Sequence, residues 1–162
     1  MTEQRAAARS TLIRRLALTL VGLCLIQFII GMGLNLFVNI TRQHPGATGS
    51  DYFGRSFHSV VWSLSHGGLL AFHTGLGILV LVAAVSLAVA TFKAPQLGLR
   101  SVGVVGALAV LASGYNGADF LDFNEDFSSM LMAVLFAIAV FCFSLILARV
   151  AARAPGGLPQ RA

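Results

Sequence analysis

Four long runs of apolar residues, separated by short polar segments, make up most of this chain. The first run, Leu16–Val38, has 23 residues without one charge. Because a helix rises about 1.5 Å per residue, such a run can cross a hydrocarbon core of about 30 Å. Comparable runs predict further spans at about 68–92, 101–118 and 127–148. The pattern predicts an all-α fold, an antiparallel bundle of four transmembrane helices in a single membrane domain over residues 16–150.

Polar segments flank and connect these runs. Residues 1–15 are basic, and residues 151–162 form a Pro/Gly-rich tail that we expect to be flexible. Residues 39–58 carry turn residues and 119–126 are acidic, so both are expected as loops. The uncharged run 59–92 is about ten residues longer than a bilayer needs. Its first part is therefore expected to form a short amphipathic helix that leads into the second span.

Composition and charge place the protein in a membrane and orient it. Hydrophobic residues make up 57% of the chain and charged residues only 10%, whereas soluble domains carry about 25% charged residues. Nine of the 11 Lys and Arg residues lie in the N-terminal segment, in the 93–100 turn and after the fourth span, which ends at about residue 148. Basic loops stay cytoplasmic, so both termini are expected in the cytoplasm. The short basic N-terminus suits anionic lipids better than a nucleic acid.

Small side chains recur at three- and four-residue spacing along three of the spans. In lipid, helices associate through close packing of small residues rather than through the hydrophobic effect. We therefore expect these stripes to pack inside the bundle, with Gln27 and Asn35 forming hydrogen bonds between helices. The stripes are Gly103, Gly106, Val110, Ser113 and Gly117 in the third span; Ala133, Ala137, Val140, Ser144 and Ala148 in the fourth; and Cys24, Gln27, Gly31 and Asn35 in the first.

The polar residues of the chain give little sign of catalysis. The predicted spans contain no Asp, Glu, Lys or Arg, which argues against a proton pump or an ion-coupled carrier. No nucleophile, base and acid occur in a recognisable set, so no catalytic residue is predicted and an enzyme is not favoured. In the acidic segment, Phe120, Phe123 and Phe127 alternate with Asp122 and Asp126. This spacing predicts an interfacial turn with its rings among headgroups and its acids in water.

His66 and His73 are the candidate ligands for a cofactor. They are seven residues apart and would share one face of a continuous helix near the outer boundary, about 10 Å apart. Met32 and Met130 are expected at the same level of the membrane. A His/Met pair from two helices could hold a haem iron, and the same residue types could hold Cu(I). The alternative is that these residues bind no metal, with His73 bonded to Asn35 or to a backbone carbonyl.

Four segments of the chain carry a resemblance to known proteins: LIQFIIGMGLNLFV, HPGA, LLAFHTGLGILV and NGADFLDFNEDFSSMLMA. Through them the whole chain resembles small uncharacterised four-span membrane proteins of bacteria. More loosely, LIQFIIGMG followed by a His-bearing second span is similar to a four-helix half of the haem A synthases. That resemblance implies haem b as the cofactor, with His66 or His73 matching the ligand on the second helix. The fourth span of this chain has no histidine, which departs from the family pattern.

Three functional hypotheses follow from the sequence. The favoured one is a partner or support subunit of a membrane complex, bound to the bilayer and to another membrane protein or a second copy. The second is a b-type haem or quinone-linked redox protein that uses His66 and His73. The third is a copper-handling or transport protein.

Overall fold

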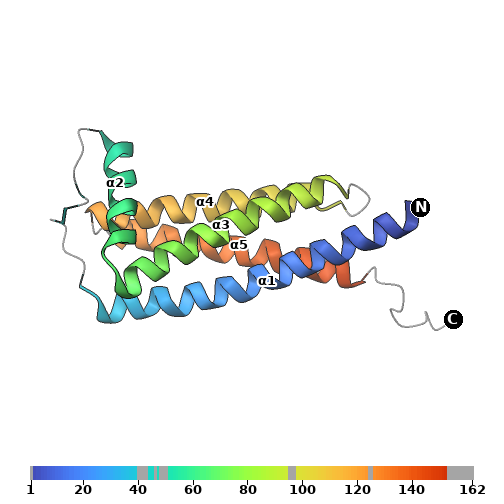
Figure 1. Cartoon of the computed structure of the whole chain (residues 1–162), viewed down its shortest axis with the longest axis horizontal. Coiled ribbons are helices and arrows are strands. Elements are labelled where there is room, and N and C mark those ends of the chain that lie inside the picture. The colour runs from blue at the N-terminus through green and yellow to red at the C-terminus, as the bar shows by residue number, and fades with distance from the viewer. Residues whose placement is uncertain are drawn as a thin grey trace.

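A computed structural model describes residues 2–39, 44–45, 47, 51–94, 98–123 and 126–152, and all regular structure in these ranges is helical. The helices are α1 (Thr2–Phe37), α2 (Tyr52–Ser65), α3 (Gly68–Phe92), α4 (Arg100–Phe123) and α5 (Asp126–Ala152). All except α2 are long and apolar enough to span a membrane. They lie side by side in a bundle (Figure 1), which confirms the predicted all-α fold of a small multi-pass membrane protein.

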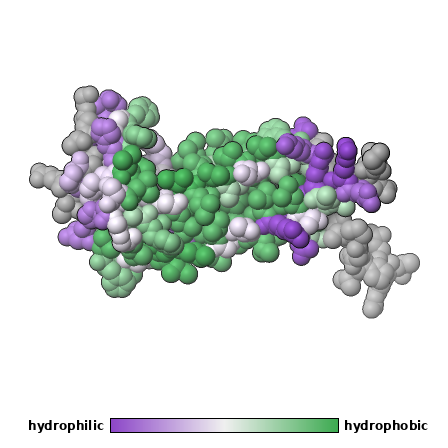
Figure 2. Space-filling view, viewed as in Figure 1, coloured by the Kyte–Doolittle hydropathy of each residue, from purple (hydrophilic) through white to green (hydrophobic). Residues whose placement is uncertain are grey.

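The two ends of the bundle differ. The start of α1 and the end of α5 lie at one end, together with the ends of α3 and α4 that face their connection, whereas α2 lies across the opposite end (Figure 1). On the face shown in Figure 2, hydrophobic surface covers the middle of the bundle, and hydrophilic surface gathers at both ends. This arrangement places the basic N-terminal segment and the basic 93–100 turn on the same side, as predicted.

The basic N-terminal segment is part of α1 rather than a separate extension. No Pro or Gly precedes Gly22, so nothing interrupts the helix, and its 36 residues extend about 54 Å. Ile13 and Ala17 are fully buried in the main core. Arg9 Nη1 donates a hydrogen bond to the Lys93 carbonyl at 2.8 Å. These contacts fasten the N-terminal turns of α1 to the connection between α3 and α4.

Glycines on α4 allow its neighbours to approach closely, as the stripe of small residues predicted. Gly103 and Gly106 are buried. A Cβ at Gly103 would lie 2.7 Å from Thr91 Oγ1 of α3, and one at Gly106 would lie 2.7 Å from Phe143 Cε1 of α5. Both distances are shorter than real Cβ contacts, so α4 packs against α3 and α5 only because these side chains are absent.

The stripe of small residues on α5 does not pack inside the bundle, and that prediction is wrong. Ala133, Ala137, Ser144 and Ala148 are exposed. The fully buried face of α5 carries Phe143 and Ile146 instead. The reason lies on α4, because Gly106 leaves a space that a bulky ring fills better than a small side chain does. The large side chains of α5 therefore turn inward and the small ones turn outward.

The acidic segment also differs from its prediction. Helix α4 continues five residues past the expected end of its span at residue 118, and α5 begins at Asp126. Asp122 is only 3% exposed, so the expectation that this acid lies in water is wrong. Of the predicted flexible tail, residues 151–152 belong to α5, and residues 153–162 lie outside the described part of the chain.

The predicted lead-in helix exists as α2, and it starts earlier than residue 59. The Asp51 side chain caps it by accepting a hydrogen bond from the Gly54 N–H at 2.7 Å. Between α2 and α3, Gly67 and Gly68 have φ angles of 78° and 62°. Residues with a Cβ rarely adopt such backbone angles. This pair of glycines makes the corner that turns α2 across the end of the bundle.

Candidate functional site

A polar pair joins α1 to α3 within the membrane-spanning part of the bundle. Gln27 Nε2 lies 3.3 Å from His73 Nε2 and donates a hydrogen bond to the His73 carbonyl oxygen at 3.1 Å. Glycines make room for both side chains. A Cβ at Gly31 would lie 3.0 Å from His73 Cε1, and a Cβ at Gly77 would lie 3.3 Å from Gln27 Nε2. The partner of His73 is therefore Gln27, whereas Asn35, its expected partner, is exposed.

The geometry of this pair defines the protonation of the imidazole. The bond to the His73 carbonyl fixes the amide with its NH₂ group toward the ring, so His73 Nε2 accepts a hydrogen bond and the ring proton lies on Nδ1. Among the described residues, neither His73 Nδ1 nor Gln27 Oε1 has a hydrogen-bond partner, although both atoms are buried. An unsatisfied polar group at membrane depth costs several kcal/mol. The pair thus presents one donor and one acceptor that the described part of the chain does not satisfy.

The other candidate ligands do not join His73. His66 is exposed and belongs to the end of α2, where its ring packs on Trp62 with centroids 4.6 Å apart. Met32 and Met130 are 43% and 57% exposed. The Gly67–Gly68 corner separates His66 from His73, so the two do not share one continuous helix. No hydrogen bond or ring contact described in the structure links any two of these four candidate ligands, which are His66, His73, Met32 and Met130.

A second polar cluster, which sequence reasoning missed, lies between α2 and the end of α4. Tyr52 Oη donates to Asp119 Oδ1 at 2.6 Å, and Ser128 Oγ of α5 donates to Asp119 Oδ2 at 2.7 Å. Asp122 accepts from Ser59 Oγ and, at 3.4 Å, from Ser56 Oγ. The hydrogen bond that Tyr52 donates to Asp119 raises the pKa of Tyr52. The ionised phenol would lose this bond and would place a second negative charge beside the carboxylate.

The signal for this cluster was present in the sequence. Ser56, Ser59 and Ser63 follow one another at three- and four-residue spacing, and all three are buried. Ser63 Oγ lies 2.9 Å from Thr74 Oγ1 of α3. A stripe of hydroxyls on a helix predicts a polar partner surface, and Asp122 of α4 and Thr74 of α3 supply it.

Near the same end, His44 stacks on an aromatic ring of α2. The His44 and Trp62 rings are 4.2 Å apart and nearly parallel, and His44 Nε2 lies 2.9 Å from the Leu121 carbonyl. Trp62 also packs on a small apolar cluster of Leu34, Leu70 and Leu121. His44 is thus bound within the structure at the α2 end of the bundle.

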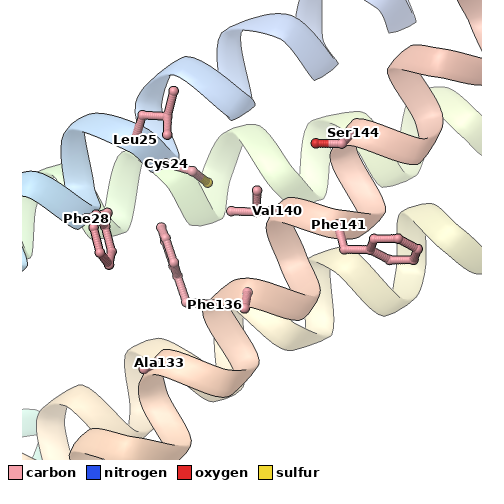
Figure 3. A pocket seen from close by; sticks show the side chains of 9 residues that line it. Cys24, Leu25, Phe28, Ala133, Phe136, Val140, Phe141 and Ser144 are labelled. Atoms are coloured by element: carbon pink, nitrogen blue, oxygen red, sulfur yellow. The ribbon is translucent and has the colours of Figure 1, made fainter.

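An apolar groove of about 520 Å³ runs between α1 and α5 (Figure 3). Cys24, Leu25 and Phe28 line it from α1, and Ala133, Phe136, Ala137, Val140, Phe141 and Ser144 line it from α5. Cys24 is fully buried and lies at its floor. The small residues of α5 that do not face the bundle interior therefore form part of this groove.

In the described part of the chain, no group of three or more His, Cys, Asp and Glu residues is arranged to hold a metal ion. Comparisons of this chain with models of protein families, with curated proteins and with solved structures find no match. The groove, the Gln27–His73 pair and the α2 cluster are thus the features of the described chain that can bind a partner or a ligand.

Proposed function

We propose that the protein is a small membrane subunit that docks a transmembrane helix of another membrane protein in the groove between α1 and α5. The observation that carries the proposal is the outward-facing stripe Ala133, Ala137 and Ser144 on α5. Small side chains let the backbones of two helices approach closely, and this close packing is the main source of helix association in lipid.

The dimensions of the groove suit a helix. From Ala133 to Ser144 the backbone of α5 rises about 16 Å, which is about three turns of a partner helix. Phe28 and Phe141 are exposed beside the stripe by 55% and 67% and can clasp the partner from both sides. The groove is almost wholly apolar, so the partner segment is an apolar helix with small residues of its own.

Site-specific crosslinking tests this proposal. A photoreactive amino acid at Ala137 should give a discrete protein adduct in membranes of the source cells. The matched control is Val82 of α3, which is 58% exposed and does not line the groove. Filling the groove with Ala133→Leu should abolish the Ala137 adduct while leaving the fold intact by circular dichroism. Lipid adducts alone at both positions would refute the proposal, and an adduct of twice the mass of the chain would identify a second copy instead.

A redox function at His73 is the second candidate, and the unpartnered Nδ1–H favours it. This N–H is a donor, which suits the carbonyl oxygen of a quinone. Iron or copper ligation would require a bare Nδ1 and would move the proton to Nε2, against the Gln27 amide. A reduced-minus-oxidised visible spectrum of the purified protein tests for haem, and quinone extraction tests for quinone. A spectrum without Soret and alpha bands, together with a quinone-free extract, would refute this candidate.

The proposed orientation places the end with the α1 start and the α5 end in the cytoplasm of a bacterial inner membrane. The distribution of basic residues supports it, because nine of 11 belong to segments of that end. Reporter fusions near Ser50 and at Arg161 should give opposite compartment signals. Equal signals at both positions would refute the four-span topology.

A further inference from the structure

The surface of α2 divides into three faces. Ser56, Ser59 and Ser63 are buried against α3 and α4. At about 100° per residue, a second stripe lies roughly 120° around the helix. It is strongly exposed despite being apolar: Phe53 is 73% exposed, Phe57 67%, Val61 49% and Leu64 42%.

The third face of α2 is polar apart from Trp62, whose ring is covered by the His44 ring. This face carries Arg55, His58 and Ser65, of which His58 and Ser65 are exposed. The Arg55 guanidinium lies over the Phe123 ring at 5.0 Å. A helix on the surface of a protein in water needs only one buried face and one polar face. The additional apolar face of α2 therefore requires an apolar environment outside the bundle.

The position of α2 supplies that environment. The helix lies at one end of the bundle, roughly perpendicular to the spans, and part of it reaches past the side of the bundle (Figure 1). In Figure 2 the hydrophobic surface of this projecting part lies on the side toward the hydrophobic middle of the bundle, and the hydrophilic surface lies on the side away from it. The apolar stripe therefore points toward the depth of the acyl chains rather than away from the membrane.

Beyond the stripe, the chain continues with further exposed apolar residues of the bundle. Beyond the Gly67–Gly68 corner, α3 continues with Leu69 and Phe72, which are 42% and 59% exposed. Phe37, at the end of α1, is 84% exposed. Because exposed apolar residues of the spans contact acyl chains in the bilayer, the apolar stripe of α2 meets the same lipid.

We infer that α2 is a lipid-binding interfacial helix, which inserts Phe53, Phe57, Val61 and Leu64 into the boundary between headgroups and acyl chains. Its polar face then meets headgroups, and its serine face covers Asp122 at the end of α4. An amphipathic helix at this depth gains free energy from the apolar area that it buries in the bilayer. The partner of this surface is the bilayer itself, not a second protein.

Depth-dependent fluorescence quenching tests the inference. The chain has one tryptophan, so Trp62→Phe gives a background without intrinsic tryptophan emission. Phe57→Trp and the matched control His58→Trp are then each reconstituted in phosphatidylcholine vesicles that contain brominated lipids. We expect lipids brominated near the carbonyl end of the acyl chain to quench the Phe57→Trp variant several-fold more than the His58→Trp variant. Aqueous iodide should show the reverse order.

A second label keeps the test independent of the tryptophan background. Spin labels on Phe57→Cys and His58→Cys, with the native buried cysteines Cys24 and Cys142 left in place, report collision with oxygen and with a water-soluble nickel complex. Preferential oxygen access at position 57 and nickel access at position 58 would support the inference. Equal access of iodide or nickel at both positions, with no quenching by brominated lipid, would overturn it and indicate a surface that a protein covers.

Discussion

The Gln27–His73 pair allows a sharp test of how α1 and α3 are held together. Gln27→Leu removes both hydrogen bonds of the amide and leaves His73 Nε2 without a donor. Hydrogen bonds between transmembrane helices contribute about 0.6 kcal/mol each on average, and a buried polar atom that loses its partner adds about 1–3 kcal/mol. We therefore expect Gln27→Leu alone to destabilise the protein by about 2–4 kcal/mol.

The double variant distinguishes this explanation from simple loss of packing. Gln27→Leu combined with His73→Leu removes the imidazole that the single variant leaves unsatisfied, together with the buried Nδ1–H that already lacks a partner. Replacing both members of a buried polar pair by apolar groups is nearly neutral. The double variant should recover most of the stability that Gln27→Leu loses.

Unfolding by sodium dodecyl sulfate in mixed micelles, followed by far-UV circular dichroism, measures these differences. Gln27→Met serves as a control that nearly keeps the length of the side chain and removes the NH₂ donor, so it should be about as unstable as Gln27→Leu. If His73→Leu deepens the loss caused by Gln27→Leu instead of relieving it, the assigned hydrogen-bond pattern is wrong.

Three further predictions concern helix packing, the buried acid and the phenol. Gly106→Ala brings a Cβ within 2.7 Å of a buried phenylalanine ring, so it should cost about 1–3 kcal/mol in the same unfolding assay, whereas Gly114→Ala, with nothing within 4 Å, should be silent. Asp122→Leu leaves the buried Ser59 hydroxyl without its acceptor and should cost about 1–3 kcal/mol, more than Asp122→Asn, which keeps an acceptor oxygen. Equal losses would contradict the assigned bond. Because Asp119 raises the pKa of Tyr52, the native state holds the phenol proton more tightly than the unfolded chain does. Stability from this group is therefore complete below the unfolded pKa of about 10 and falls as the pH rises above it, and Tyr52→Phe should flatten that alkaline fall in a pH series of unfolding curves.

Much of the candidate site depends on contacts that are distant in sequence. Gln27 and His73 were each recognisable as polar residues within apolar runs, but their pairing required the register between α1 and α3. Asn35 lies two turns from Gln27 on the same predicted face, and the sequence offers no reason to prefer one over the other. The buried serines of α2 could have been noticed from their spacing, whereas the acids that bind them lie more than 60 residues away.

The sequence by itself determined the four spans and their all-α character, because hydropathy and helical rise are local properties of the chain. It also determined the glycine stripe of α4, since only glycine permits the approach at Gly103 and Gly106. Only the tertiary structure decided which face of α5 turns inward, because that choice depends on the space that Gly106 leaves for Phe143. It likewise decided the burial of Asp122 and the three faces of α2. A helical wheel shows which residues share a face, but the environment of each face is set by the neighbouring helices.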